Sequence, residues 1–332
     1  MSQLKVSFAC GLYDRMLALY TGEVRPVGID LNFLAIDSPR DIFDRMGGGL
    51  EFDACEMSSS EYISRLAGGD CPLVAIPVFP SRVFRHSFIC VNRKAGIKSA
   101  KDLEGKRVGV PLYTMTAAVF IRGLLQHEYG VDLSRIQWVQ GAINSAGAHG
   151  RPSAPPLLRP VHIEINDSGK SLNQLLVEGK IDAIAGTSVP AAIRTNPDIV
   201  RLFPNYREVE KQYYKRTGIF PIMHLVVIRR ELYQQHRFVA SSLYEAMCDA
   251  KKIALSKMRY AGATRYMLPW LSDDLEEIDQ LFGADPWPYG IEANRPTLEA
   301  LVNYLVEQGL IDRPLPLDQI FVPTYGERHE GL

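Results

Sequence analysis

The sequence predicts an α/β protein of two lobes with a ligand cleft between them. Short β-rich segments alternate with helical patterns along most of the chain, an order typical of α/β units with largely parallel sheets. The 332 residues are enough for two domains, and a composition of 46% hydrophobic and 23% charged residues is that of a globular protein. The simplest division joins residues 1–95 and 219–332 in lobe 1, which holds both termini, and inserts residues 96–218 as lobe 2. The strands at Phe88 and Val226 then connect the lobes.

The elements of lobe 1 follow from short apolar runs and one cap pattern. Ser58 and Glu61 have the spacing of a capping box, which predicts a helix from there to Leu66. The strands are expected at residues 4–10, 52–56, 73–78, 88–92 and 223–228, with helices at 38–46 and 239–257.

Lobe 2 shows the same alternation. Gly130 can close a helix over residues 117–129, and Ser171 with Gln174 opens another that Gly179 ends. The remaining stretch from Asn144 to Arg159 is rich in Gly, Pro, Ala and Ser, which predicts a surface loop. Strands are expected at residues 107–110, 136–139 and 182–185.

Charge and cysteine content exclude several classes of protein. The net charge of −1 gives no support to a nucleic-acid or membrane-surface partner. The chain has no apolar run long enough to span a bilayer and no secretory h-region after Met1. Five cysteines without a CxxC pair indicate buried, reduced thiols. We therefore expect a cytoplasmic protein.

Motifs for common cofactors and nucleophiles are missing. The sequence contains no GxGxxG, GxxxxGK[ST], HExxH or GxSxG, and the glycines at 47–49 follow a predicted helix, where they suit a C-cap turn. We expect no organic cofactor. Carboxylates and hydroxyls scattered among the loops could bind a divalent metal, so a metal site stays an open alternative.

Polar side chains gather in the loops that follow the predicted strands. Ligands of open α/β sheets bind at these carboxyl ends, where helix N-termini present free N–H groups. The arginines there can hold a carboxylate with their planar fork, so an anionic small molecule fits this mouth. The candidate binding residues are Tyr13, Asp14, Glu56, Ser58, Arg82, Arg85, Tyr113, Thr114, Thr116 and Ser188.

Each candidate also has a structural interpretation. Arg82 and Arg85 can pair with surface carboxylates, and Asp14 can cap a helix that begins near Tyr13. The hydroxyls of Ser58, Thr116 and Ser188 suit helix N-caps, a role compatible with ligand binding.

Two histidines stand where proton transfer is possible. His86 lies beside Arg85 before a strand, and His224 leads into an apolar strand. A hydrogen-bonded structural histidine explains each as well as catalysis does; if both flank one cleft, they become candidates for acid–base chemistry. No role is assigned to His127, His149, His162, His236 and His329, which lie in polar contexts.

Several segments together resemble the 4,5-dihydroxyphthalate decarboxylase family. The similarity runs from Leu4 to about Pro323, and its most specific motifs are PVFPSR-FRH and GIFPIMH. Leu112, Thr114 and the Asn144–Arg159 loop depart from the expected pattern. The matching segments are GEVRPVGIDL (22–31), EFDACEMS (51–58), VAIPVFPSRVFRH (74–86), GKRVGVP (105–111), TGIFPIMH (217–224) and WPYGIE (287–292).

The resemblance implies a type 2 periplasmic-binding-protein-like fold and a decarboxylase of phthalate degradation. Its substrate would be a small hydroxylated aromatic dicarboxylate. The reaction implied is the conversion of 4,5-dihydroxyphthalate to 3,4-dihydroxybenzoate and carbon dioxide. The ring would serve as electron sink, with Arg82 or Arg85 anchoring the retained carboxylate. His224 and His86 would transfer protons, and which is acid and which is base stays open.

Other functions on the same scaffold remain alternatives. A solute-binding protein of the ABC-transporter type for a small carboxylate would share fold and cleft, but it needs export, and no signal peptide or lipobox cysteine is visible. A ligand-sensing module would carry an output domain. A dehydratase or another decarboxylase stays open, and so does a homo-oligomer.

Overall fold

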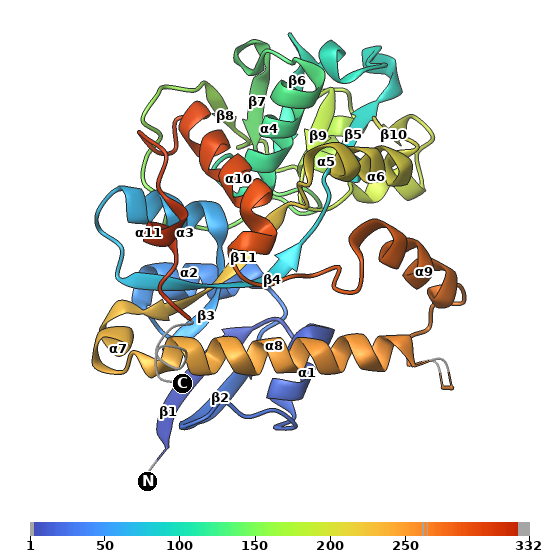
Figure 1. The fold of residues 1–332 in the computed structure, drawn as a ribbon. Coiled ribbons are helices and arrows are strands. Elements are labelled where there is room, and N and C mark those ends of the chain that lie inside the picture. Colours follow the sequence, from blue (N-terminus) through green and yellow to red (C-terminus); the bar gives the residue numbers. More distant parts are fainter. Residues whose placement is uncertain (1–2, 261, 264, 325–332) are drawn as a thin grey trace.

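A computed structural model describes residues 3–324 of the chain except 261 and 264, and its strands form two mixed sheets. Figure 1 shows the sheets as a lower and an upper lobe, which confirms the two-lobed α/β prediction. In spatial order, the first sheet contains β2 (Ile29–Ala35), β1 (Leu4–Cys10), β3 (Ala54–Ser58), β11 (Ile222–Arg229) and β4 (Leu73–Arg82). The second contains β10 (Ile199–Arg201), β5 (Ile89–Asn92), β9 (Ala183–Ala185), β6 (Arg107–Val110), β7 (Gln137–Gln140) and β8 (Ile163–Ile165).

Each sheet includes one reversed strand where the chain crosses between lobes. β11 runs antiparallel to β3 and β4, and β5 runs antiparallel to β9 and β10. The chain leaves the first sheet after β4, passes through a short 3₁₀ turn, η1 (His86–Phe88), and enters the second sheet as β5. The division predicted above placed residues 89–92 in lobe 1, whereas their pairing belongs to the second sheet. The remaining domain limits stay a prediction.

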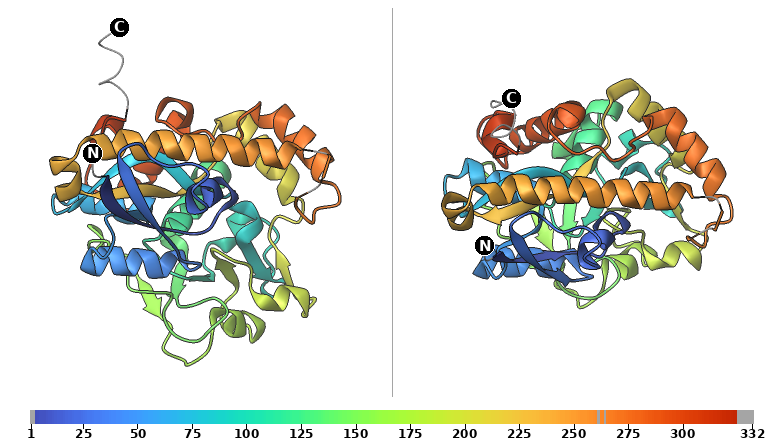
Figure 2. Two further views of the ribbon diagram at one scale, coloured as in Figure 1. Left: turned by 90° about the horizontal axis from the view of Figure 1, so that it is seen from below. Right: turned by 60° about the horizontal axis from the view of Figure 1, so that its bottom comes forward.

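Helices cover both sheets. The long helix α8 lies across the first lobe, where it packs on α1 and β4 (Figure 2). The first lobe contains α1 (Asp14–Tyr20), α2 (Pro39–Gly49), α3 (Ser59–Ala67), α7 (Arg230–Gln235) and α8 (Phe238–Arg259). The second contains α4 (Thr116–Tyr129), α5 (Leu172–Val177) and α6 (Tyr206–Thr217). The C-terminal segment contains α9 (Leu271–Phe282), α10 (Arg295–Glu307) and α11 (Leu317–Ile320).

The C-terminal segment joins the lobes by close packing of α10 on α4. A Cβ on Gly123 would lie 2.3 Å from a ring carbon of Tyr304, so this contact requires glycine. Just after α10, the Gln308 side chain accepts a hydrogen bond from Arg122 Nε at 2.8 Å and donates to the Val119 carbonyl at 3.0 Å. In Figure 1, α10 runs from the lower lobe to the upper one. The two lobes are therefore held together away from their crossing strands.

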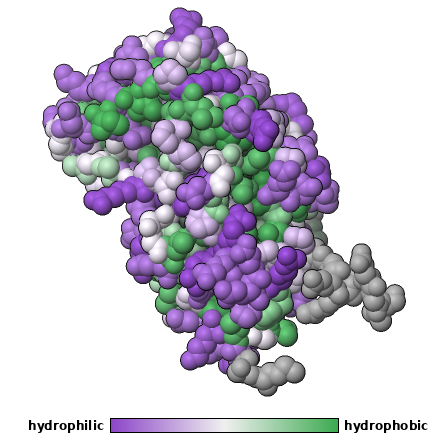
Figure 3. Space-filling view, turned by 90° about the vertical axis from the view of Figure 1, so that its left-hand side faces the viewer, coloured by the Kyte–Doolittle hydropathy of each residue, from purple (hydrophilic) through white to green (hydrophobic). Residues whose placement is uncertain are grey.

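No helix of the described residues is long and apolar enough to cross a membrane. Hydrophilic side chains cover most of the face shown in Figure 3, with hydrophobic ones in smaller patches. All five cysteines are free thiols, as predicted; four are buried and Cys248 is half-buried.

Candidate functional site

A cavity of about 310 Å³ lies where the two lobes meet. The first lobe contributes the start of α2 and residues of β4 and β11, and the second lobe contributes the start of α4 and two loops. A hollow of about 640 Å³ beside α10 is larger, but no histidine lines it. The interlobe cavity is lined by Ser38, Pro39, Arg40, Phe43, Ser58, Ser81, Val83, Arg85, Met115, Thr116, Ala117, His149, Thr187, Met223 and His224.

His224 is held in place by a buried carboxylate. β3 and β11 are neighbouring strands, and this pairing brings His224 Nδ1 to 2.9 Å from Glu56 Oε2. Glu56 is fully buried and also accepts hydrogen bonds from the Gly11 N–H at 2.7 Å and the Tyr13 hydroxyl at 3.1 Å. Tyr13 and Glu56 thus act on the cavity through His224 and do not line it.

The charge on Glu56 orients the imidazole. Burial opposes ionisation, but hydrogen bonds from His224, Gly11 and Tyr13 and the charge of His224 outweigh it and lower the pKa of Glu56. A carboxylate on Nδ1 fixes the tautomer that carries hydrogen there. Within the described residues Nε2 has no hydrogen-bond partner, and the Phe43 ring packs edge-on against the imidazole at 4.8 Å between centroids. Nε2 is therefore available for proton transfer.

Arg85 supplies a cation without a bound partner. Its side chain is 5% exposed and lies over the Phe88 ring, 5.1 Å from the ring centroid. Nε is buried with no hydrogen bond, and no described residue accepts one from the guanidinium. Burial, partly offset by the charge of Glu210, lowers the pKa of Arg85 to about 9, which keeps it charged at neutral pH. An unpaired buried cation is costly, so this position favours an anionic ligand.

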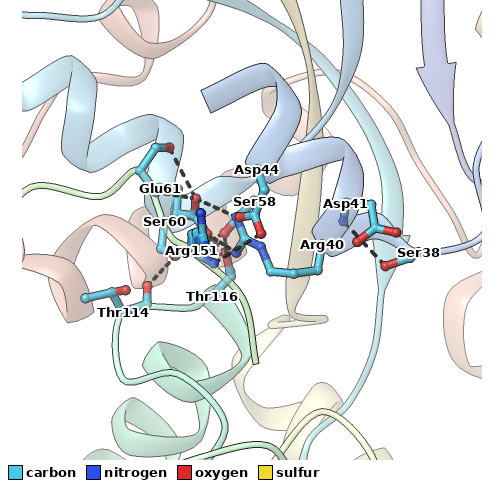
Figure 4. A network of polar contacts seen from close by, with 11 residues as sticks. Ser38, Arg40, Asp41, Asp44, Ser58, Ser60, Glu61, Thr114, Thr116 and Arg151 are labelled. Carbon is cyan, nitrogen blue, oxygen red and sulfur yellow. Dashed lines mark hydrogen bonds and ion pairs between the residues drawn. The ribbon is translucent and has the colours of Figure 1, made fainter. Parts of the chain in front are cut away.

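A second arginine at the cavity is already neutralised. Arg40, near the start of α2, forms a two-pronged ion pair with the buried Glu61 of α3, and it also pairs with Asp44 at 2.8 Å. Ser153, in the loop after β7, donates to Glu61 from its N–H and its hydroxyl, both at 3.3 Å. Figure 4 shows Arg40 reaching from α2 into this network.

The starts of α3 and α4 meet through their hydroxyls. Ser58 Oγ lies 3.0 Å from Thr116 Oγ1, which also accepts the Ser60 N–H at 2.9 Å; Ser60 Oγ donates to the Thr114 carbonyl at 2.7 Å (Figure 4). Ser58 makes no cap bond, so the predicted capping box with Glu61 is wrong. The N-termini of these two helices line the same cavity as Arg85 and add to the attraction for an anion.

The structure separates Arg82 and His86 from the cavity. Arg82 donates to Asn294 Oδ1 at 2.7 Å and to the Phe220 carbonyl at 2.9 Å, so it ties β4 to the C-terminal segment. His86 is 1% exposed among the rings of Tyr129, Phe203 and Tyr213. Burial, and then the charge of Arg216, lower the pKa of His86 to about 4. The expectation that both histidines flank one cleft is wrong.

The other predicted binding residues divide in the same way. Ser58 and Thr116 line the cavity, whereas Tyr113 is buried against Arg122 and Trp138, and Thr114 contributes only its carbonyl to the network. Asp14 begins α1 and pairs with Arg15; Ser188 is exposed, and its neighbour Thr187 lines the cavity instead.

Sequence reasoning missed several cavity residues, among them Ser38, Arg40 and His149. Ser38 caps α2, which follows β2, and β2 was not predicted. The Ser-Pro pair at 38–39 is a helix-start signal. The rule that candidate site residues lie in the loops after strands could therefore have included the loop between β2 and α2. His149 was set aside as exposed, whereas it is half-buried and lies near the charges of Arg40, Asp44 and Glu61, which come from α2 and α3. His329 lies outside the described residues.

No cluster of three or more potential metal ligands from His, Cys, Asp and Glu occurs in the part of the chain that the structure describes. The lining of the cavity includes imidazoles, hydroxyls and guanidinium groups.

Comparison with known proteins identifies similar sequences. Residues 66–151 match the NMT1/THI5-like family model. A 4,5-dihydroxyphthalate decarboxylase of Comamonas testosteroni is 37% identical over 325 residues, with 98% of each chain covered. A protein of the same name from Pseudomonas putida is 35% identical over 65% of this chain and 83% of its own.

Solved structures share the fold. The periplasmic aliphatic sulphonate-binding protein SsuA of Escherichia coli aligns with a TM-score of 0.54 at 12% identity, covering 96% of this chain and 98% of its own. The alkanesulfonate-binding protein SsuA of Xanthomonas axonopodis pv. citri, bound to MOPS, aligns with a TM-score of 0.52 at 10% identity, covering 97% and 98%. The fold is thus that of periplasmic binding proteins, as the sequence predicted.

Proposed function

The chain belongs to the 4,5-dihydroxyphthalate decarboxylase family, and from this membership we propose that it converts 4,5-dihydroxyphthalate to 3,4-dihydroxybenzoate and carbon dioxide. Similarity over nearly the full length supports the activity. The observation that carries the proposal is the pairing, in one cavity, of an unpartnered buried Arg85 with His224 on a buried carboxylate.

Substrate binding relies on the asymmetry of charge in the cavity. The two carboxylates of 4,5-dihydroxyphthalate are equivalent, so the protein must select the one that leaves. Arg85 has no carboxylate partner within hydrogen-bonding distance in the described chain, whereas the charge of Arg40 is paired with Glu61 and Asp44. We assign the retained carboxylate to Arg85, with the N-termini of α3 and α4 lining the same cavity. The departing carboxylate then receives no free cation, which favours its loss.

The reaction needs proton transfer at opposite positions of the ring. Each carboxylate is para to a hydroxyl. Removing the phenolic proton pushes electrons to the carbon that bears the departing carboxylate, and an acid protonates that carbon. The resulting dienone loses carbon dioxide, and the electrons of the broken bond restore the aromatic ring. His224 Nε2 provides one of these transfers, with Glu56 stabilising the charge that the imidazole carries.

The test is turnover of 4,5-dihydroxyphthalate by the purified chain, measured as 3,4-dihydroxybenzoate by chromatography, with and without chelator. Phthalate lacks the phenol, so it should bind without reacting. His224→Asn should lower kcat by about 10²–10⁴-fold, the usual worth of acid–base catalysis, and leave binding measured by calorimetry intact. Arg85→Gln should instead raise the dissociation constant, whereas the exposed Arg93→Gln should change neither. A wild-type protein inert toward 4,5-dihydroxyphthalate would refute the proposal.

The fold favours a second candidate, a solute-binding protein for a small carboxylate. The same experiment separates the two functions, because a receptor would bind 4,5-dihydroxyphthalate tightly and release no product. We further propose a cytoplasmic location, which the five free thiols support. Cell fractionation tests this location directly.

A further inference from the structure

The loop of residues 144–159 extends from the second lobe onto the first. Ser153 donates twice to Glu61, and the Arg151 N–H donates to Asp44 Oδ2 at 3.1 Å. Glu61 is fully buried and is the main partner of Arg40. The loop is thus fastened to α2 and α3 by two carboxylates that also hold a cavity-lining arginine.

Two glycines allow the loop and α2 to approach each other closely. A Cβ on Gly150 would lie 2.4 Å from Cδ of Arg40, and a Cβ on Gly47 would lie 2.6 Å from Oγ of Ser153. Because Glu61 and Asp44 hold Arg40, it cannot easily move aside. The residue that precedes Gly150 is therefore placed beside Arg40, at the edge of the cavity.

That residue is His149, which lines the same cavity as His224 and Arg85. No described residue forms a hydrogen bond with its imidazole, so the ring keeps a free lone pair. Resting on the proposed decarboxylation, we propose that His149 is the base that removes the phenolic proton of the substrate. His224 is then the acid that protonates the ring carbon.

The charges around the two imidazoles suit these opposite roles. Arg40, Asp44 and Glu61 face His149 from α2 and α3. Burial, and then the charge of Arg40, lower the pKa of His149, although the two carboxylates oppose this. Its neutral form therefore prevails at neutral pH, as a base requires. His224 has a carboxylate on Nδ1, which stabilises the imidazolium that a proton donor needs.

The proton balance closes over one turnover. His149 takes the phenolic proton, and the freed electron pair moves through the ring to the para carbon, which receives a proton from His224 Nε2. The bond to the carboxylate then breaks, carbon dioxide leaves, and its electron pair returns through the ring to the phenol oxygen. The oxygen recovers its proton from His149, and water reprotonates His224. One proton is consumed for each carbon dioxide released.

The experiment compares His149→Ala with His162→Ala, a control at an exposed histidine before β8, by steady-state kinetics and calorimetry with 4,5-dihydroxyphthalate. We expect His149→Ala to lower kcat by at least about 10²-fold, while the dissociation constant changes far less. Added imidazole should restore part of the rate. The low-pH fall in wild-type kcat, caused by protonation of His149, should disappear from the residual activity of the variant.

Ser153→Ala separates proton transfer from loop placement, because it removes one bond to Glu61 and keeps His149. Loss of kcat in Ser153→Ala equal to that in His149→Ala, without imidazole rescue of the latter, would show a structural role and overturn the inference. Wild-type kcat in His149→Ala, together with an inactive His224→Asn, would also overturn it and leave the decarboxylase proposal standing. A wild-type chain without activity would instead refute the proposed function.

Discussion

At the scale of single residues, the surroundings of an imidazole decide its role. His224 has a buried carboxylate on one nitrogen and a cavity at the other, whereas His86 is enclosed by three aromatic rings. Both residues stand in family-like motifs, and Arg85 next to His86 does reach the cavity. Neighbouring positions in a sequence motif therefore divide between catalysis and packing.

His86 should make the protein less stable in mild acid. Its pKa is about 4 in the folded protein against 6.5 when unfolded, so below pH 6.5 the unfolded chain gains a proton that the folded chain does not. The free energy of unfolding should fall by up to about 3 kcal/mol between pH 6.5 and 4 from this group. Urea unfolding across this range should show a smaller fall for His86→Gln than for wild type. Equal slopes, with His162→Gln as control, would contradict the prediction.

Glu56 should govern His224 without touching substrate. Glu56→Gln keeps the shape but removes the charge that stabilises the imidazolium, so we expect kcat to fall by about 10²–10⁴-fold with little change in KM. Tyr13→Phe removes one hydrogen bond to Glu56 and leaves the carboxylate on His224, so its loss of kcat should be much smaller. Steady-state kinetics of both variants check the order. A Tyr13→Phe defect as large as that of Glu56→Gln would contradict it.

At the scale of elements, the three glycines that end α2 differ in what surrounds them. A Cβ on Gly48 would meet nothing within 4 Å. Gly48→Ala should therefore raise the free energy of unfolding by about 0.5–1 kcal/mol, because alanine loses less backbone conformational entropy than glycine when the helix forms. Gly47→Ala gains the same term but forces Ser153 away. We expect Gly47→Ala to gain no stability and to lose kcat. Chemical denaturation and kinetics of the pair test this, and identical behaviour would refute it.

Local patterns predicted elements well and contacts poorly. Ser171 and Gln174 form the capping box that their spacing predicts, and Gly130 ends α4 in a left-handed conformation. The same spacing at Ser58 and Glu61 fails because Arg40 and Ser153 occupy Glu61. These partners lie far away in the sequence, so a local rule could not find them.

At the scale of the molecule, the site depends on how the lobes are joined. The reversed strands β5 and β11 were expected as the connections, because apolar runs mark them. The packing of α10 on α4 was not expected, since Gly123 and Tyr304 carry no signal of their contact. Cavity residues come from both lobes, so this packing helps to fix the distance between His224 and His149.

This joining predicts that the two lobes unfold together. Arg122 is 1% exposed, and Gln308→Leu would leave its Nε without the Gln308 acceptor, which should cost about 1–3 kcal/mol of stability. Denaturant unfolding can be followed in single-tryptophan variants that keep Trp138 in β7 or Trp287 before α10. The two midpoints should coincide in the Gln308-containing protein, and Gln308→Leu should lower both. Separate midpoints before that substitution would show that the lobes unfold independently and that α10 does not couple them.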